Sequence, residues 1–191
     1  MIRRRTSRLS LALALALLAS VSVAARTVND AQARASESAV KAAYLFHFAQ
    51  FVRWPAGALA AGQPFTICTV GRDPFGATLD STVAGETIDG HRIVVARLGR
   101  DANPARCQIA FLSSSEEGRA AAWITTLGGG PTLTVSDMPD FIAHGGMLQF
   151  VVTDNRVRFE INLSAADAAG LMPSSELARV AAAVHRDPPG R

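Results

Sequence analysis

Lysine and histidine are scarce in this chain, and their scarcity excludes several kinds of catalytic site. Lys41 is the only lysine among 191 residues, so a phosphate-binding Walker loop or a catalytic Schiff base has a single candidate. The four histidines are scattered, and no pair has the spacing of a zinc-binding helix. A Gly-x-Ser-x-Gly nucleophile elbow is also missing. We therefore expect a chain that is not an enzyme and that holds neither a metal nor a cofactor.

The first 25 residues predict export from the cytoplasm. Four arginines lie within the first eight residues, and no acidic residue accompanies them. The apolar run Leu9–Leu18 follows, and small residues then continue to Ala25. This pattern is typical of a secretory signal peptide, with cleavage near Ala24 or Ala25. The run is shorter than the roughly 20 apolar residues of a membrane-spanning helix, so we expect a cleaved, periplasmic chain.

Cleavage changes the charge balance of the chain. The whole sequence has 19 basic and 16 acidic residues, and loss of the four arginines leaves 15 against 16. No basic surface then remains to indicate binding to nucleic acid. The remaining length of about 165 residues suits one domain with its own core. We expect a signal peptide over 1–25, a flexible leader over 26–36, one domain over 37–185 and a disordered tail over 186–191.

Cysteine is limited to one pair, Cys68 and Cys107. In an oxidising compartment an even pair predicts a disulfide bond, and two buried free thiols are the alternative. The bond would close a loop of about 40 residues. By lowering the entropy of the unfolded chain it would stabilise the fold by about 4 kcal/mol.

The first element expected in the domain is a helix over residues 37–53, where alanine, leucine and phenylalanine dominate and glycine and proline are absent. One face carries Val40, Tyr44, His47 and Phe51, and the adjacent face carries Leu45, Phe48 and Val52. So wide an apolar arc predicts burial on more than one side. The helix should end at Trp54-Pro55, because a residue before proline avoids helical geometry.

Short apolar runs then alternate with helical stretches. We expect strands at Phe65–Val70, His91–Leu98, Cys107–Leu112 and Thr132–Ser136, with helices over 74–83 and 114–127. A hairpin follows, in which Asp154-Asn155 joins strands Met147–Thr153 and Arg156–Leu163. Two short helices, about Ala165–Ala169 and Ser175–Val184, close the chain. The order predicts a single-domain α/β fold, with a mixed sheet of parallel core and antiparallel edge hairpin and helices on both faces.

The second hairpin strand alternates apolar and polar residues with a period of two. Its polar face is either solvated or in contact with a partner. We take as candidate partner-binding residues Arg156, Arg158, Glu160 and Asn162.

Blocks spread over nearly the whole mature chain carry a resemblance to a known family. They are Lys41–Leu45 with Phe51–Pro55, Ile67–Gly71 with Asp73–Gly76, Cys107–Ser113, Leu133–Asp137 with Gly145–Met147, Asn155–Asn162, and Ala169–Leu171 with Ser174-Ser175. In this order they resemble the YfiR-like family of periplasmic regulators.

The resemblance implies a periplasmic protein that is not an enzyme. Such proteins bind and restrain the periplasmic part of an inner-membrane diguanylate cyclase, which lowers cyclic di-GMP and biofilm formation. An outer-membrane lipoprotein can draw them away. The Cys68–Cys107 pair fits the family, but the second cysteine pair of its best-known member is absent, with Phe141, Ala143 and Met147 in the matching region.

Two other functions stay open at the level of sequence. The first is a small-ligand binding module accessory to a sensor kinase or transporter, which a cavity lined by Tyr44, Arg158 and Asn162 would favour. The second is an enzyme, which would need His91, His144 and a carboxylate to converge. The sequence also leaves open whether the chain forms a homodimer.

Overall fold

A computed structural model describes residues 32–99, 106–128 and 130–186. The expected signal peptide and residues 26–31 of the expected leader lie outside these residues. Residues 32–36, also assigned to the leader, are instead helical, and helical geometry continues to residue 51. This stretch contains neither glycine nor proline, which agrees with helix formation. Residues up to Glu37 form a separate unit, and the domain begins at Ser38.

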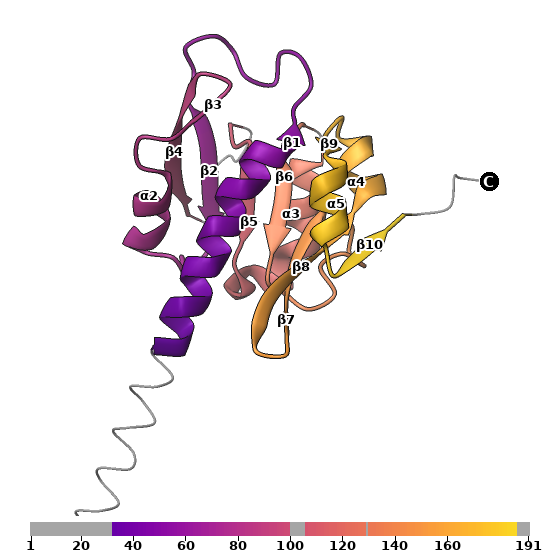
Figure 1. Cartoon of the computed structure of the whole chain (residues 1–191). Coiled ribbons are helices and arrows are strands. Elements are labelled where there is room, and N and C mark those ends of the chain that lie inside the picture. Colours follow the sequence, from indigo (N-terminus) through magenta and orange to yellow (C-terminus); the bar gives the residue numbers. More distant parts are fainter. Residues whose placement is uncertain (1–31, 100–105, 129, 187–191) are drawn as a thin grey trace, which may run out of the picture. The chain divides into compact units, whose positions relative to one another are not determined.

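The domain is built around an eight-stranded sheet with the order β10-β8-β7-β6-β5-β2-β4-β3 (Figure 1). The strands are β2 (Phe65–Val70), β3 (Thr87–Ile88), β4 (His91–Leu98), β5 (Ile109–Leu112), β6 (Leu133–Ser136), β7 (Leu148–Thr153), β8 (Arg156–Asn162) and β10 (Ala183–His185). Strands β4, β2, β5, β6 and β7 run parallel, and β8 pairs antiparallel with β7. A separate two-stranded ladder joins β1 (Val52–Arg53) to β9 (Met172–Pro173). The expected fold class is confirmed.

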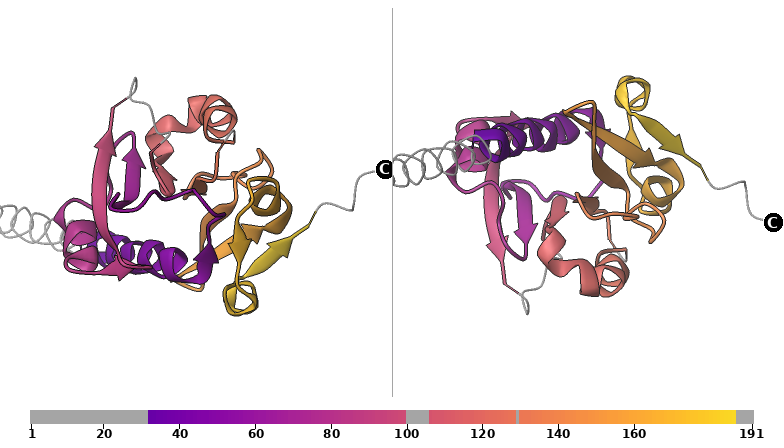
Figure 2. Two further views of the ribbon diagram at one scale, coloured as in Figure 1. Left: turned by 90° about the horizontal axis from the view of Figure 1, so that it is seen from above. Right: turned by 90° about the horizontal axis from the view of Figure 1, so that it is seen from below.

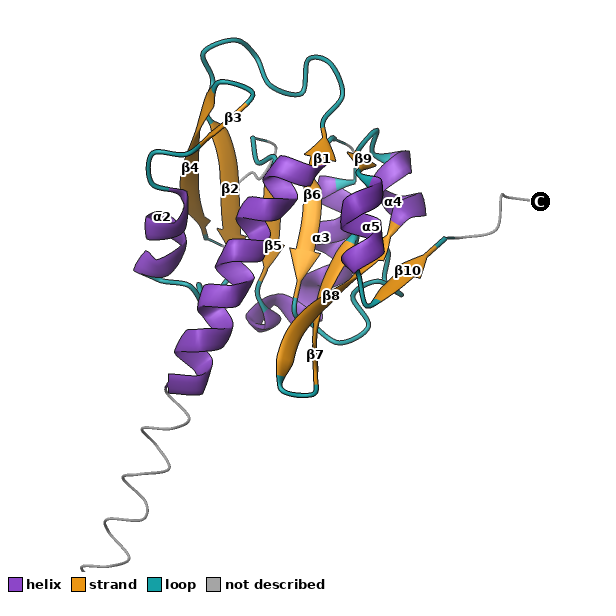
Figure 3. Cartoon of the chain, viewed as in Figure 1, coloured by secondary structure: helices purple, strands orange, loops and turns teal. Residues whose placement is uncertain are grey.

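Helices cover both faces of this sheet (Figure 2). The N-terminal helix, whose part within the domain covers residues 38–51, and α2 (Ala77–Val83) lie on one face. The 3₁₀ helix η1 (Ser114–Arg119) and α3 (Ala120–Leu127) lie on the other. The short helices α4 (Leu163–Ala168) and α5 (Ser175–Val180) follow the hairpin. The connection over residues 54–64 is a loop (Figure 3), as the Trp54-Pro55 helix end predicts.

The C-terminal element differs from its prediction. The helix expected to reach Val184 ends at Val180, and Ala183–His185 instead form β10, parallel to β8. The amide of Ala182 donates to the carbonyl of Phe159, which starts this pairing. An unpaired strand edge leaves backbone groups unsatisfied, so pairing with β8 outweighs the local helix preference.

The larger core lies beneath the N-terminal helix. Its aromatic centre joins Phe48 to Phe150 and Phe159, with ring centroids 5.9 and 5.1 Å apart. Tyr44 packs on the same rings. Each such side chain contributes about 1.5–3 kcal/mol through burial. The helix is also held by an ion pair in which Lys41 Nζ lies 2.7 Å from Asp137 Oδ2, directly after β6.

Arg97 of β4 ties α2 to the loop that precedes it. Its Nε lies 2.7 Å from Asp73 Oδ2, and its Nη2 pairs with Asp80 of α2 and donates to the Gly76 carbonyl. The hydrogen bond from Arg97 lowers the pKa of the Asp80 carboxyl below its ordinary value of 3.8.

This shift predicts a small loss of stability in acid. A carboxyl whose pKa is depressed in the folded state stabilises the fold above its unfolded pKa, and the contribution disappears as the pH falls through the folded value. We expect Asp80→Asn to lower the urea midpoint slightly at pH 7, because the pair is exposed to solvent. The difference from wild type should vanish well below pH 3.8. An equal difference at pH 7 and in acid would contradict this account.

Candidate functional site

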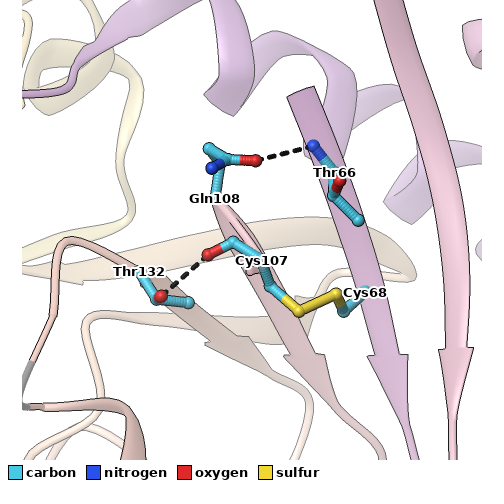
Figure 4. Close-up of a disulfide and its surroundings, with 5 residues drawn as sticks. All are labelled: Thr66, Cys68, Cys107, Gln108 and Thr132. Carbon is cyan, nitrogen blue, oxygen red and sulfur yellow. Dashed lines mark hydrogen bonds between the residues drawn. A yellow bond between two sulfur atoms is a disulfide. The ribbon is translucent and has the colours of Figure 1, made fainter. Parts of the chain in front are cut away.

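The two cysteines form a disulfide bond between neighbouring parallel strands (Figure 4). Cys68 lies in β2, Cys107 precedes β5, and their Cα atoms are 5.8 Å apart. Both are buried in the smaller core, together with Trp123 and Leu127 of α3. A hydrogen bond also holds the chain just before β5, since Thr132 Oγ1 donates to the Cys107 carbonyl. The predicted bond is confirmed, and it is a buried cross-link between neighbouring parts of the sheet.

The histidines named for the enzyme hypothesis contact different parts of the chain. His91 Nδ1 lies 2.7 Å from the Gln63 carbonyl, before β2. His144 Nδ1 lies 2.7 Å from the Asp140 carbonyl, in the turn after β6. Neither ring makes a hydrogen bond or ion pair with a carboxylate within the described residues. The same residues contain no group of three metal-ligating side chains placed to hold an ion.

Side chains of η1 lie close to Gly71 at the usual ligand crevice of a doubly wound sheet. In such sheets ligands bind beyond the carboxyl ends of the strands where the strand order reverses, here between β2 and β5. Gly71, with φ of 86°, follows β2, and a Cβ there would lie 2.6 Å from Ser115 Oγ and 2.7 Å from Glu116 Cγ. Glu116 is itself buried and accepts a hydrogen bond from Trp123 Nε1 at 3.0 Å. The loop after β2 and the start of η1 therefore lie in close contact at this position.

The four candidate partner-binding residues have different surroundings. Arg156 and Arg158 are exposed on β8. Glu160 is half-buried, and its Oε2 lies 2.8 Å from His185 Nε2 of β10. Asn162 is buried, and its Oδ1 accepts a hydrogen bond from the Ala165 amide at the start of α4. The structure therefore leaves the two arginines available to a partner and gives Asn162 a capping role.

The capping role leads to a prediction for Asn162→Ala. Loss of an N-terminal helix cap costs about 1 kcal/mol, so the free energy of unfolding should fall by that amount. Asn162→Asp keeps the accepting oxygen and should stay close to wild type. Urea unfolding of the three proteins measures both values. Equal loss in the two variants would show that the cap is not the reason for the effect.

An apolar groove is lined by residues of the N-terminal helix, β8 and α5. It encloses about 270 Å³, and its walls are Tyr44, His47, Phe51, Phe159, Glu176, Leu177 and Val180. Large apolar side chains stay exposed beside it, with Val180 at 57% and Phe51 at 39%. Exposed apolar patches of this kind mark interaction sites. The groove is the described surface best suited to contact with another molecule.

This groove was not predicted from the sequence, although the apolar stripe of the first helix contains three of its seven lining residues. The stripe Val40, Tyr44, His47 and Phe51 was expected to be buried, but Val40, His47 and Phe51 are exposed. Only the adjacent face, with Leu45 and Phe48, is buried in the core. An apolar arc wider than one buried face was the feature of the sequence that could have indicated an exposed apolar surface on this helix. The groove that Tyr44 lines in the described part of the chain does not include Arg158 or Asn162, so it is not the cavity expected for a small ligand.

Comparison with known proteins supports the resemblance seen in the sequence. No helix within the described residues has the length and apolar character needed to cross a membrane. No curated protein matches the chain. Residues 38–182 match the family described as YfiR/HmsC-like. These residues make up most of the 191-residue chain, and they include the disulfide, the groove and the hairpin. The chain therefore belongs to the YfiR/HmsC-like family.

Proposed function

We propose that this chain is a non-enzymatic periplasmic regulator that binds the extracytoplasmic part of an inner-membrane signalling protein. The partner is a diguanylate cyclase, and binding restrains it, so that cyclic di-GMP and biofilm formation fall. The chain acts by binding an inactive conformation of the cyclase better than the active one. An outer-membrane lipoprotein that binds the chain would release the cyclase.

The family match over residues 38–182 carries this proposal. Two features of the structure support it. The buried Cys68–Cys107 bond suits an oxidising compartment such as the periplasm. The exposed apolar groove beside the N-terminal helix suits contact with a protein. Since a fold alone does not determine function, the partner has to be tested directly.

Deletion of the gene tests the proposal in cells. We expect cyclic di-GMP to rise in the deletion strain and to return to the parental level when the partner cyclase is deleted as well. The second deletion also identifies the cyclase. A cyclic di-GMP level that does not change on deletion of the chain would contradict the proposed function.

The exposed pair Arg156 and Arg158 gives a separate prediction. Charges at the edge of an interface mainly set the rate of association and its salt dependence. We expect Arg156→Glu with Arg158→Glu to slow association with the cyclase's extracytoplasmic domain by about 10-fold at low salt, and less at high salt. Stopped-flow or surface-based kinetics measure this rate. An unchanged association rate would show that the two arginines lie outside the interface.

A further inference from the structure

We propose that the groove between the N-terminal helix and α5 receives one large apolar side chain of the partner, with a lysine or arginine of the same partner segment beside it. This inference rests on the proposed function and adds the location and the chemistry of the contact. Three features of the groove lead to it, namely its size, its exposed apolar margin and a carboxylate that has no partner among the described residues.

The size of the groove fits a side chain better than a separate ligand. Small-molecule sites usually enclose about 300–1,000 Å³, with several polar groups that fix the ligand. The groove encloses about 270 Å³, and its floor is the ring of Phe159 with the side chain of Leu177. An aromatic or branched aliphatic side chain that enters such a site is the usual anchor of a protein interface.

Large apolar side chains of the groove and of neighbouring elements are exposed to solvent. Val180 of α5 is 57% exposed, Val40 of the N-terminal helix is 43% exposed, and Val184 of β10 is 44% exposed. Val180 lines the groove together with Phe51, which is 39% exposed, so part of the apolar wall of the groove is exposed to solvent. A free small molecule would leave this margin in water, whereas a protein segment would cover it and exclude solvent.

The negative charge of Glu176 indicates which kind of partner residue lies beside the inserted apolar side chain. Glu176 lines the groove from the first turn of α5, and its carboxylate has no hydrogen bond or ion pair within the described part of the chain. Burial of this charge by a neutral partner would be unfavourable. A cation placed beside the anchor would pair with it, so the partner segment should carry lysine or arginine next to its apolar side chain.

The test uses the full mature chain and the purified extracytoplasmic domain of the cyclase identified by the double deletion. Calorimetry compares wild type with Val180→Arg, which fills the groove margin and pairs with Glu176 one helical turn away. We expect this variant to weaken binding by about 30-fold or more. Met172→Arg is the matched control, because Met172 is 51% exposed but lines a different pocket, on β9. It should bind within about twofold of wild type.

Two further variants test the role of the Glu176 carboxylate. Glu176→Gln should weaken binding by about threefold and reduce its dependence on salt. Glu117→Gln is the control, because Glu117 is exposed on η1, on the opposite face of the sheet. Thermal unfolding verifies that each variant is folded. If Val180→Arg unfolds the domain, Phe51→Ala shortens a groove side chain on the other helix and should weaken binding in the same direction.

The results separate the inference from the proposed function. Equal binding by wild type, Val180→Arg and Phe51→Ala would overturn the groove as the docking site and leave the regulator intact. Self-association that Val180→Arg abolishes, without loss of cyclase binding, would also overturn it and assign the groove to a second copy of the chain. If wild type does not bind the domain and deletion leaves cyclic di-GMP unchanged, the proposed function itself fails.

Discussion

Replacement of both cysteines with alanine is expected to lower the free energy of unfolding by about 4 kcal/mol. Cys68 and Cys107 are 39 residues apart, so their bond removes much of the conformational freedom of the unfolded chain. A domain of this size has a total stability of about 5–15 kcal/mol. The loss would therefore bring the domain close to unfolding at physiological temperature.

Guanidinium unfolding of three samples measures this loss and its cause. The oxidised wild type should have the highest midpoint, and the reduced wild type and the double-alanine variant should both lie well below it. The reduced wild type keeps both sulfurs in the smaller core, so its difference from the variant reports their packing alone. A reduced wild type as stable as the oxidised one would show that the cross-link does not stabilise the domain.

Lys41→Met is expected to lower the free energy of unfolding by about 3 kcal/mol. The substitution keeps the apolar stem but removes the ammonium, whose Nζ lies 2.7 Å from Asp137 Oδ2. Asp137 Oδ1 is buried and already lacks a hydrogen bond within the described residues, so the variant would leave a largely uncompensated carboxylate. The lysine side chain is only 8% exposed, which limits compensation by water.

The matched double variant separates the charge from the packing. Asp137→Asn in the Lys41→Met background removes the unpaired charge and should recover a large part of the lost stability. Urea unfolding of wild type, both single variants and the double variant gives the coupling energy. Additive losses would show that Lys41 and Asp137 contribute independently, which contradicts an ion pair that holds the helix to the end of β6.

The sheet was predictable from local patterns. Phe65–Val70 is a short apolar run that precedes a glycine turn, and β8 alternates apolar and polar residues. The disulfide followed from the presence of two cysteines in a chain expected to be exported. The alternation of apolar and polar residues placed Asn162 on the polar face of the strand. This pattern does not show where a strand ends, so the change to a helix directly after Asn162 was not predicted. Its position directly before a helix was the signal of a cap.

Features that depend on tertiary packing were not predictable in the same way. β10 forms because β8 offers an open edge, although the residues Ala181–Val184 favour helix when considered alone. The groove forms because α5 packs beside the N-terminal helix without covering Phe51. The sequence identified the apolar stripe, but only the position of α5 shows which part of it stays exposed.

The most direct test measures cyclic di-GMP in cells that lack the chain and are complemented with wild type, Val180→Arg or Met172→Arg. Immunoblots of periplasmic fractions verify that all three proteins are exported in equal amounts. Wild type and Met172→Arg should restore the low level, whereas Val180→Arg should leave it high. A level that stays the same with or without wild-type chain would contradict regulation of a cyclase by this protein.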